Sequence, residues 1–294
     1  MYDVRETFQA ASAEEVLELL EARPGAVLVA GGTDVMIRLK KRKLKDAVLI
    51  GLQKVSELQG VSLEPDGALC IGAGCTFAEL EQHELLLKCV PMLAAACHQV
   101  GSPQIREMAT IGGNLCNGAV SADSAPALYA LDAELEVLSR SGVRRIPVCG
   151  FHTGPGKTVL GAGDLLLRIR IPRASYEGHG GCYLKFGQRN AMEISTLGCA
   201  VNVALTEDRT RIRQAAVAYG VAAPVPVRCY ETEARLAGME AGGEALRVLR
   251  TTVLSQLSPR DSWRASRELR EQLVRELGCR ALRQAIQQAG GEMA

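Results

Sequence analysis

Hydrophobic residues in the first 60 positions change between helical spacing and short continuous runs. Ser12 opens a capping box, and the apolar positions within 16–20 form one face of a helix. The run 27–30 is typical of a buried strand, positions 35–39 are spaced as in a helix, and 47–50 forms a second apolar run. This order of strand, loop, helix and strand predicts a small parallel or mixed unit.

The pattern changes from about residue 69, where strands, helices and loops alternate more rapidly. It predicts, in order, a strand over 69–73, a capped helix from Thr76, an Ala-rich helix over 91–100, a Gly- and Asn-rich loop over 110–117, a hairpin of strands 134–138 and 143–148, and a strand over 165–171. We therefore expect an α+β fold for this part of the chain.

A polar, Gly-rich segment at 173–181 predicts a domain boundary. Beyond it, apolar residues indicate strands over 199–205 and 211–220, which are separated by the charged turn 207–209. Leucines and then alanines recur every four residues between Leu269 and Ala289, which is helical spacing. The C-terminal domain is thus expected to combine antiparallel strands with helices.

Composition and charge exclude several classes of function. The chain has 294 residues with 34 Lys and Arg against 33 Asp and Glu, and only 4% of its residues are aromatic. A net charge of +1 gives no electrostatic reason to expect nucleic acid or an anionic membrane as a partner. No transmembrane segment or signal peptide is recognisable, so we expect a cytoplasmic protein. Its ten cysteines lack a C-x-x-C pair and are expected to be reduced thiols, with no metal site.

Two glycine pairs carry the candidate chemistry. The first lies in Ala30-Gly31-Gly32-Thr33-Asp34 and the second in Thr110-Ile111-Gly112-Gly113-Asn114. Glycine pairs allow backbone N–H groups to converge on an anion without obstruction by a Cβ atom, and each threonine adds a hydroxyl donor. Two such loops from distant parts of the chain suit a diphosphate, although either pair is also compatible with an ordinary turn. Neither fits the G-x-G-x-x-G or G-x-x-x-x-G-K-[ST] pattern.

Together with further segments, the two glycine loops resemble a known family. The additional matching segments are 101–106, Asn117, 122–126, 131–133, 150–157 and 259–266. The combination is similar to the FAD-binding subunits of molybdenum hydroxylases, above all those of bacterial xanthine dehydrogenases. This resemblance covers essentially the whole chain. It implies an α+β fold with a two-part FAD-binding domain of the vanillyl-alcohol-oxidase/enolpyruvyl-reductase type over 1–175, divided into about 1–57 and 58–175, and a C-terminal domain over 176–294.

The resemblance also implies which residues hold one noncovalent FAD. The first family loop corresponds to Val27, Leu28, Val29, Ala30, Gly31, Gly32, Thr33 and Asp34, and the second to Thr110, Ile111, Gly112, Gly113 and Asn114. Four single positions complete the set. Asp123 matches an acid near the ribityl–ribose region, Val100 a residue against the flavin ring, Leu166 a leucine beside the flavin and Lys185 a lysine near the ring. No catalytic residue is implied on this chain.

The function implied by the resemblance is electron transfer within a heterotrimer related to the xanthine dehydrogenases of purine metabolism. A small partner subunit would carry [2Fe-2S] clusters, a large one would carry molybdopterin, and NAD would accept the electrons. A stand-alone FAD oxidoreductase and a non-enzymatic assembly or binding protein that kept the fold are the alternatives. The basic run 38–45 is compatible with a solvated helix end, an acidic partner or the phosphates of NAD.

Overall fold

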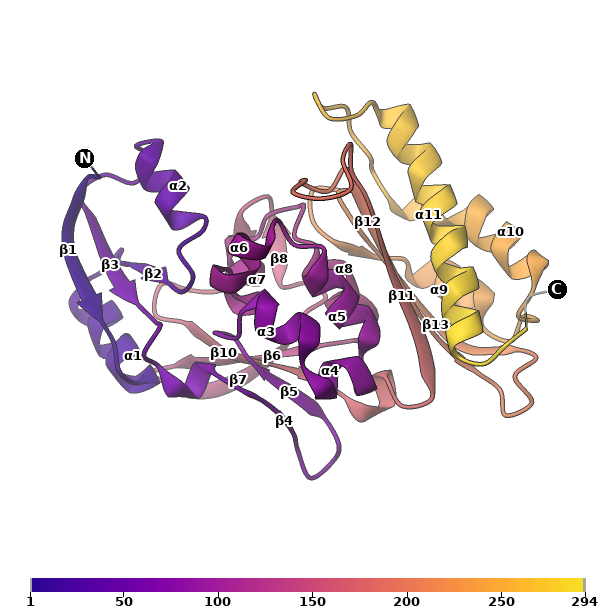
Figure 1. The fold of residues 1–294 in the computed structure, drawn as a ribbon, viewed down its shortest axis with the longest axis horizontal. Coiled ribbons are helices and arrows are strands. Elements are labelled where there is room, and N and C mark those ends of the chain that lie inside the picture. The colour runs from indigo at the N-terminus through magenta and orange to yellow at the C-terminus, as the bar shows by residue number, and fades with distance from the viewer. Residues whose placement is uncertain (1, 293–294) are drawn as a thin grey trace.

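The three larger β-sheets follow one another along the longest axis of the molecule (Figure 1). The computed structural model describes residues 2–292. An N-terminal sheet lies at one end, a five-stranded sheet with a group of short helices lies in the middle, and a four-stranded sheet covered by the last helices lies at the other end. The expected α+β architecture is confirmed.

The N-terminal sheet is parallel, with the strand order β1-β3-β2. Its elements are β1 (Val4–Gln9), α1 (Ala13–Ala22), β2 (Val27–Val29), α2 (Val35–Lys40) and β3 (Ala47–Gly51). Ser12 caps α1 by accepting a hydrogen bond from the N–H of Glu15, while the Glu15 carboxylate accepts one from the N–H of Ala11. The predicted parallel or mixed unit is confirmed, with both of its strand pairings parallel, and β1 is an additional strand that the sequence did not indicate.

The middle sheet is antiparallel throughout, in the order β4-β5-β10-β6-β7. Its strands are β4 (Val61–Leu63), β5 (Leu69–Gly72), β6 (Glu134–Ser139), β7 (Gly142–Pro147) and β10 (Leu165–Ile171), and a small ribbon of β8 (His152–Gly154) and β9 (Lys157–Thr158) lies apart from it. The predicted hairpin and the strand over 165–171 are confirmed.

Six short helices follow one another in the chain between β5 and β6. They are α3 (Phe77–Gln82), α4 (Glu84–Cys89), α5 (Pro91–His98), α6 (Pro103–Met108), α7 (Ile111–Asn117) and α8 (Ser124–Ala130). The prediction of a loop over 110–117 is wrong, because Thr110 caps a helix that contains both glycines of the second pair. Helix propensity disfavours glycine, but tertiary packing of this turn overrides that local preference.

The C-terminal sheet is antiparallel and buried on both faces. Its order is β11 (His179–Phe186), β12 (Leu197–Leu205), β13 (Ile212–Gly220), β14 (Val227–Arg228). Alternate positions of β12 and β13 belong to different cores. Small residues such as Ala200 and Ala218 join the core of the middle region, against α5 and α8, whereas larger residues such as Val201 and Tyr219 join the second core. The small side chains allow the helices to pack closely on the sheet.

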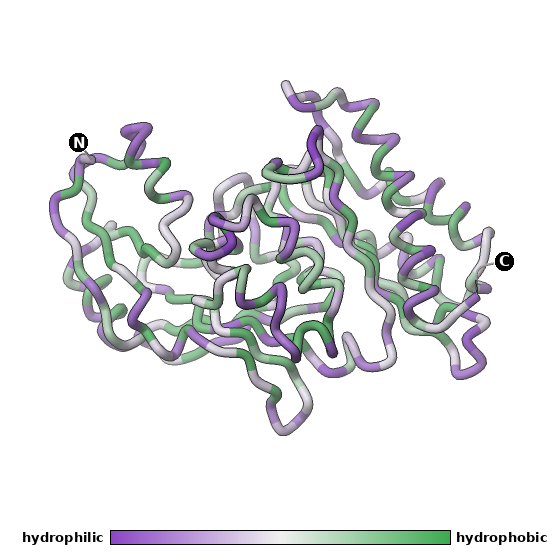
Figure 2. The backbone as a smooth tube through the Cα atoms, in the orientation of Figure 1, coloured by the Kyte–Doolittle hydropathy of each residue, from purple (hydrophilic) through white to green (hydrophobic). Residues whose placement is uncertain are grey.

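The last helices cover the other face of this sheet. They are α9 (Tyr230–Leu236), α10 (Gly243–Thr252) and α11 (Arg267–Gln288), and short 3₁₀ turns occur at Ser56–Leu58, Arg173–Ser175 and Val253–Gln256. The predicted helical tail is confirmed. In Figure 2, hydrophobic residues follow the strands, whereas the charged turn at 207–209 between β12 and β13 is hydrophilic.

Candidate functional site

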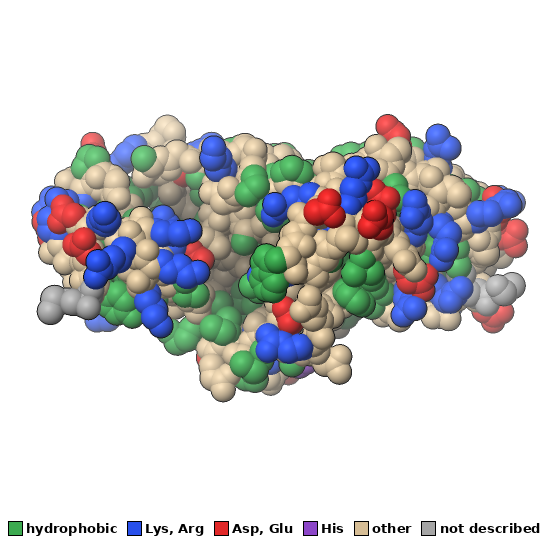
Figure 3. Space-filling view, turned by 90° about the horizontal axis from the view of Figure 1, so that it is seen from above, with side chains coloured by type: hydrophobic (Ala, Val, Ile, Leu, Met, Phe, Trp, Pro, Cys, Tyr) green, Lys and Arg blue, Asp and Glu red, His purple; other side chains and the backbone are tan. Residues whose placement is uncertain are grey.

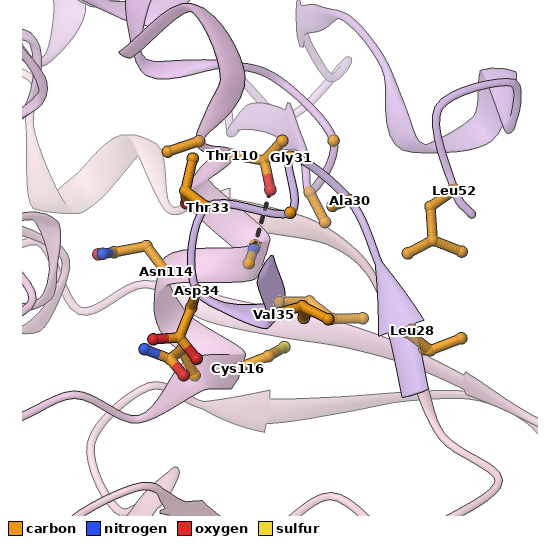
Figure 4. Close-up of a pocket in the computed structure, with 18 of the residues that line it drawn as sticks. Leu28, Ala30, Gly31, Thr33, Asp34, Val35, Leu52, Thr110, Asn114 and Cys116 are labelled. Atoms are coloured by element: carbon orange, nitrogen blue, oxygen red, sulfur yellow. Dashed lines mark hydrogen bonds between the residues drawn. The ribbon is translucent and has the colours of Figure 1, made fainter. Parts of the chain in front are cut away.

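A cavity of about 270 Å³ lies between the first glycine loop, α7 and the start of β10. In Figure 4, Gly31 and Thr33 lie beside Thr110, and Asn114 and Asp34 lie at one end of the cavity while Leu28 and Leu52 lie at the other. Gln53 contacts the first glycine loop without lining the cavity, because its Nε2 donates a hydrogen bond to the carbonyl of Ala30 at 2.6 Å. The cavity thus brings together two segments about 80 residues apart in the sequence.

The first loop presents a row of unpaired backbone donors. The N–H groups of residues 31–35 meet no acceptor among residues 2–292, and Gly32 adopts a φ of +70°. Consecutive free N–H groups around a left-handed glycine form a concave site suited to phosphate or another anion. This loop thus leaves its backbone donors unoccupied within the described residues.

The second glycine pair plays a different part. The N–H groups of Ile111 and Gly112 donate to the carbonyls of Cys75 and Ala73, and those of Gly113 and Asn114 donate to the Oγ1 and the carbonyl of Thr110. All four donors are therefore occupied within the protein. The expectation that this pair directs free N–H groups at an anion is wrong, because the chain folds them into a capped helix turn.

Close packing explains why several of these positions are glycine. A Cβ on Gly31 would lie 1.6 Å from the carbonyl oxygen of Met108, and one on Gly112 would lie 2.5 Å from the Cβ of Ala73. These two glycines allow the first loop to approach α6 and allow α7 to approach the end of β5. A Cβ on Gly113 would meet only the capping hydroxyl of Thr110, at 2.8 Å.

A second cavity, of about 320 Å³, shares Asn114 with the first. Val100 and Asp123 line it, together with α6 and residues 192–194 of the loop between β11 and β12. The Oδ1 of Asn114 accepts a hydrogen bond from Ser124 at 2.8 Å, which orients its amide. The two cavities therefore lie next to each other, with Asn114 at their common border.

Asp123 is the centre of a buried polar cluster at the wall of the second cavity. Its Oδ1 accepts from Tyr183 at 2.9 Å and from Ser195 at 2.5 Å, and its Oδ2 accepts from the Lys185 ammonium at 2.8 Å. Lys185 also donates to the carbonyl of Gln99 at 2.8 Å. Burial and the neighbouring carboxylate raise the pKa of Tyr183 well above its ordinary value, so its hydroxyl stays protonated and donates.

This cluster leaves limited capacity for a ligand. A carboxylate accepts about four hydrogen bonds, and three of those of Asp123 come from the protein. Asp123 occupies the N-cap position of α8, but its side chain makes no cap hydrogen bond, so it does not serve as an ordinary helix cap. The side chain of Lys185 is 91% buried, so it is not a solvated lysine on the surface of β11.

Most of the residues expected to hold FAD lie at one or other cavity. Val27, Leu28, Ala30, Gly31, Gly32, Thr33, Asp34, Thr110, Gly112, Gly113, Asn114 and Leu166 line the first, and Val100, Asn114 and Asp123 line the second. Lys185 lines neither cavity, but its ammonium donates to the Oδ2 of Asp123, which lines the second. Val29 and Ile111 do not line either cavity, and Ile111 is fully buried in the core.

Sequence reasoning missed several residues that line the cavities. In the first, these include Val35, Arg38, Cys116, Asn117 and Asp164. Arg38 was visible only as the start of a basic run, and Asn117 only as part of the family resemblance. No sequence pattern identifies residues 192–194 as cavity-lining, because their position at the second cavity depends on how β11 and β12 pair.

Other chemistries find little support in the described part of the chain. Within residues 2–292, no group of three or more His, Cys, Asp and Glu side chains is placed to hold a metal ion, and no helix is both long and apolar enough to span a membrane. All ten cysteines are free thiols. Burial raises the pKa of Cys116, beside the first cavity, to about 12, which disfavours a reactive thiolate.

Two sequence families match consecutive parts of the chain. Residues 3–174 match the FAD binding domain in molybdopterin dehydrogenase, and residues 182–285 match the CO dehydrogenase flavoprotein C-terminal domain. The chain is also 38% identical to the xanthine dehydrogenase FAD-binding subunit of Escherichia coli O157:H7, over all of both chains. It is 31% identical to the nicotinate dehydrogenase FAD-subunit of Eubacterium barkeri, over 80% of this chain and 81% of the relative.

Solved structures agree with these sequence matches. Carbon monoxide dehydrogenase from Hydrogenophaga pseudoflava superposes with a TM-score of 0.92 at 25% identity, covering 98% of this chain and 99% of the other. Quinoline 2-oxidoreductase from Pseudomonas putida 86 shares the fold with a TM-score of 0.91 over 98% and 99% of the two chains. These similarities show that the chain belongs to the FAD-binding medium subunits of the molybdenum hydroxylases, a family of oxidoreductase subunits.

Proposed function

We propose that this chain holds one noncovalent FAD across the two cavities and passes electrons from [2Fe-2S] clusters of a small partner subunit to NAD. The observation that carries this proposal is the row of free N–H groups at 31–35, in a cavity that shares Asn114 with a second cavity containing a buried carboxylate. A dinucleotide needs both a site for its diphosphate and a separate site some distance along its length.

In this proposal, the residues that line the two cavities have distinct roles in binding FAD. The loop 27–34 receives the diphosphate through its backbone donors, and the Thr33 hydroxyl adds one more. Thr110 and the second glycine pair form the opposite wall by packing closely. Asp123 accepts a hydrogen bond from a sugar or ribityl hydroxyl, and Val100 and Leu166 offer apolar contact. With domain limits of 1–175, divided into subdomains of about 1–57 and 58–175, and 176–294, the first cavity lies within the first domain, and residues 192–194 of the second domain line part of the second cavity.

Lys185 acts mainly through Asp123 rather than as a free cation. Its ammonium bonds to the carboxylate and to a backbone carbonyl. It therefore orients Asp123 and counters the rise in the pKa of that carboxyl that burial causes. Bound FAD supplies the exchange between one-electron and two-electron chemistry that links iron–sulfur clusters to NAD. This chain contributes binding, orientation and exclusion of water around the cofactor.

A molybdopterin-containing large subunit is part of the same proposal. The names of the similar proteins, which include dehydrogenases of xanthine, nicotinate and carbon monoxide, describe subunits of different enzymes on one fold. The substrate is therefore expected to be selected on another subunit, with xanthine and purine metabolism favoured by the 38% identity. A cytoplasmic location fits a chain that exchanges electrons with NAD.

An absorption spectrum of the purified chain tests FAD binding, and acid precipitation shows whether the flavin is released and is FAD rather than FMN. Bleaching of the flavin by NADH in a stopped-flow instrument then tests the acceptor. If NADH fails to bleach the flavin but reduced ferredoxin bleaches it rapidly, the proposal that NAD is the electron acceptor is rejected, while the proposed role as a flavin-binding subunit stands. A single chain that is fully active on xanthine would reject the need for partner subunits.

A further inference from the structure

Arg38 is a cavity-lining cation whose donors are free. Three ionisable side chains of the Asp, Glu, Lys and Arg types line the first cavity: Arg38, Asp34 and Asp164. Arg144 already holds Asp164, with two nitrogens on the two carboxylate oxygens at 2.9 and 2.5 Å. Arg38 makes no ion pair or side-chain hydrogen bond with any residue in 2–292, although Asp34 lies only four positions earlier.

The position of Arg38 is set by the packing of α2. Leu39, its neighbour, is 97% buried and anchors the helix, whereas Met36 and Ile37 are exposed. Arg38 itself is partly buried, while Lys40, Lys41, Arg42, Lys43 and Lys45 are exposed and line neither cavity. In Figure 3, Lys and Arg side chains gather on the lobe of the N-terminal sheet, beside a hollow in the surface. One cation of the basic run is thus separated from the others by its place in the cavity.

Arg38, a partly buried residue, lines the same cavity as the free N–H groups, and this combination favours an anion. The five N–H donors of its guanidinium are arranged to bind two oxygens of a phosphate at once, and removing such a cation from water is costly unless it is paired. The N–H groups of 31–35 supply only partial charges, whereas a diphosphate diester carries about two full negative charges. The cavity therefore combines donors for the oxygens with one full positive charge.

We infer that Arg38 pairs with the diphosphate of the bound dinucleotide and makes the first cavity selective for ligands that carry this group. The inference rests on the proposed function, because the anion in question is that of FAD. It assigns a binding role to one residue of the basic run 38–45 and leaves the rest as solvated charges. Affinity for FAD and ADP should depend on Arg38, whereas affinity for riboflavin, which lacks phosphate, should not.

The test compares Arg38→Gln with Lys41→Gln in the full chain after removal of its flavin. Titrations with FAD, ADP and riboflavin at several salt concentrations give the dissociation constants. We expect R38Q to raise those for FAD and ADP about tenfold or more, which corresponds to at least about 1.4 kcal/mol, and to reduce their salt dependence. K41Q should stay within about threefold of the unmodified chain, and riboflavin should bind both variants equally.

Two further measurements keep the outcome interpretable. The melting temperature of each flavin-free variant shows whether R38Q is folded, and Arg38→Lys, which keeps the charge but not the fork of donors, should give an intermediate loss. Equal dissociation constants and salt dependence for R38Q, R38K and K41Q would overturn the role of Arg38 while leaving FAD binding intact. Failure of the unmodified chain to bind FAD would instead overturn the proposed function, and the inference with it.

Discussion

Replacing Gly31 with alanine should separate the first glycine loop from α6. A Cβ at this position would lie 1.6 Å from the Met108 carbonyl oxygen and 2.4 Å from its carbon, whereas real Cβ contacts shorter than 3.0 Å essentially do not occur. The two backbones must therefore move apart by roughly 1.4 Å, the difference between 3.0 and 1.6 Å. Because both partners are backbone, no change of rotamer can relieve the contact.

The expected cost is about 3 kcal/mol of unfolding free energy, at the upper end of the range for overpacking. Gly25→Ala is the matched control, because Gly25 has a φ of +84° and nothing within 4 Å of its Cβ position. It should cost only the strain of a left-handed residue, about 1–2 kcal/mol. Gly31 lacks a positive φ, so its effect isolates the contact.

Chemical denaturation of both variants, together with the ratio of FAD to protein after purification, provides the assay. Gly31→Ala should lose most of its flavin because the donors at 31–35 move with the loop, whereas Gly25→Ala should keep it. The reasoning would be refuted if Gly31→Ala were no less stable than Gly25→Ala and retained stoichiometric FAD. The loop and α6 would then have to be more compliant than close backbone packing allows.

Three further outcomes are expected. Lys185→Met should lower the free energy of unfolding by about 3–5 kcal/mol in denaturant titrations, because it leaves Asp123 buried without its cation; a loss below 1 kcal/mol would contradict this. Burial lowers the pKa of His152 in the folded protein. The stability that the neutral imidazole contributes is therefore present above about pH 6.5 and is lost as the pH falls through the lowered pKa. His152→Gln should flatten the decline of the unfolding free energy between pH 7 and 5, and an unchanged slope would contradict this. Thr33→Ala should weaken FAD binding by about 0.5–1.5 kcal/mol in a fluorescence titration, and unchanged affinity would remove its hydroxyl from the site.

Much of the fold follows from short-range features of the sequence. The cap at Ser12, the capping box at Thr76 and the alternation in the hairpin of β6 and β7 act between residues close in the chain, so their structures could be predicted locally. The first glycine loop belongs to the same class. The left-handed φ of Gly32 is a local consequence of the Gly-Gly pair, whereas Gly31 is required by its close contact with the Met108 carbonyl.

The tertiary structure decided how these pieces are used. The second glycine pair looked like the first, but the carbonyls of Ala73 and Cys75 occupy two of its donors and Thr110 the others. Asp123 receives its partners from 60 to 72 residues further along the chain, and no local pattern encodes such distances.

Arg38 shows the same limit. Within the sequence it is one of several equivalent cations, and only the burial of Leu39 beside it turns this one toward the cavity. Local propensities and periodicity therefore determined most of the elements and the left-handed turn of the first loop. The choice of which donors and charges remain free for a ligand depended on packing between distant segments, because burial and competing hydrogen-bond partners exist only in the folded chain.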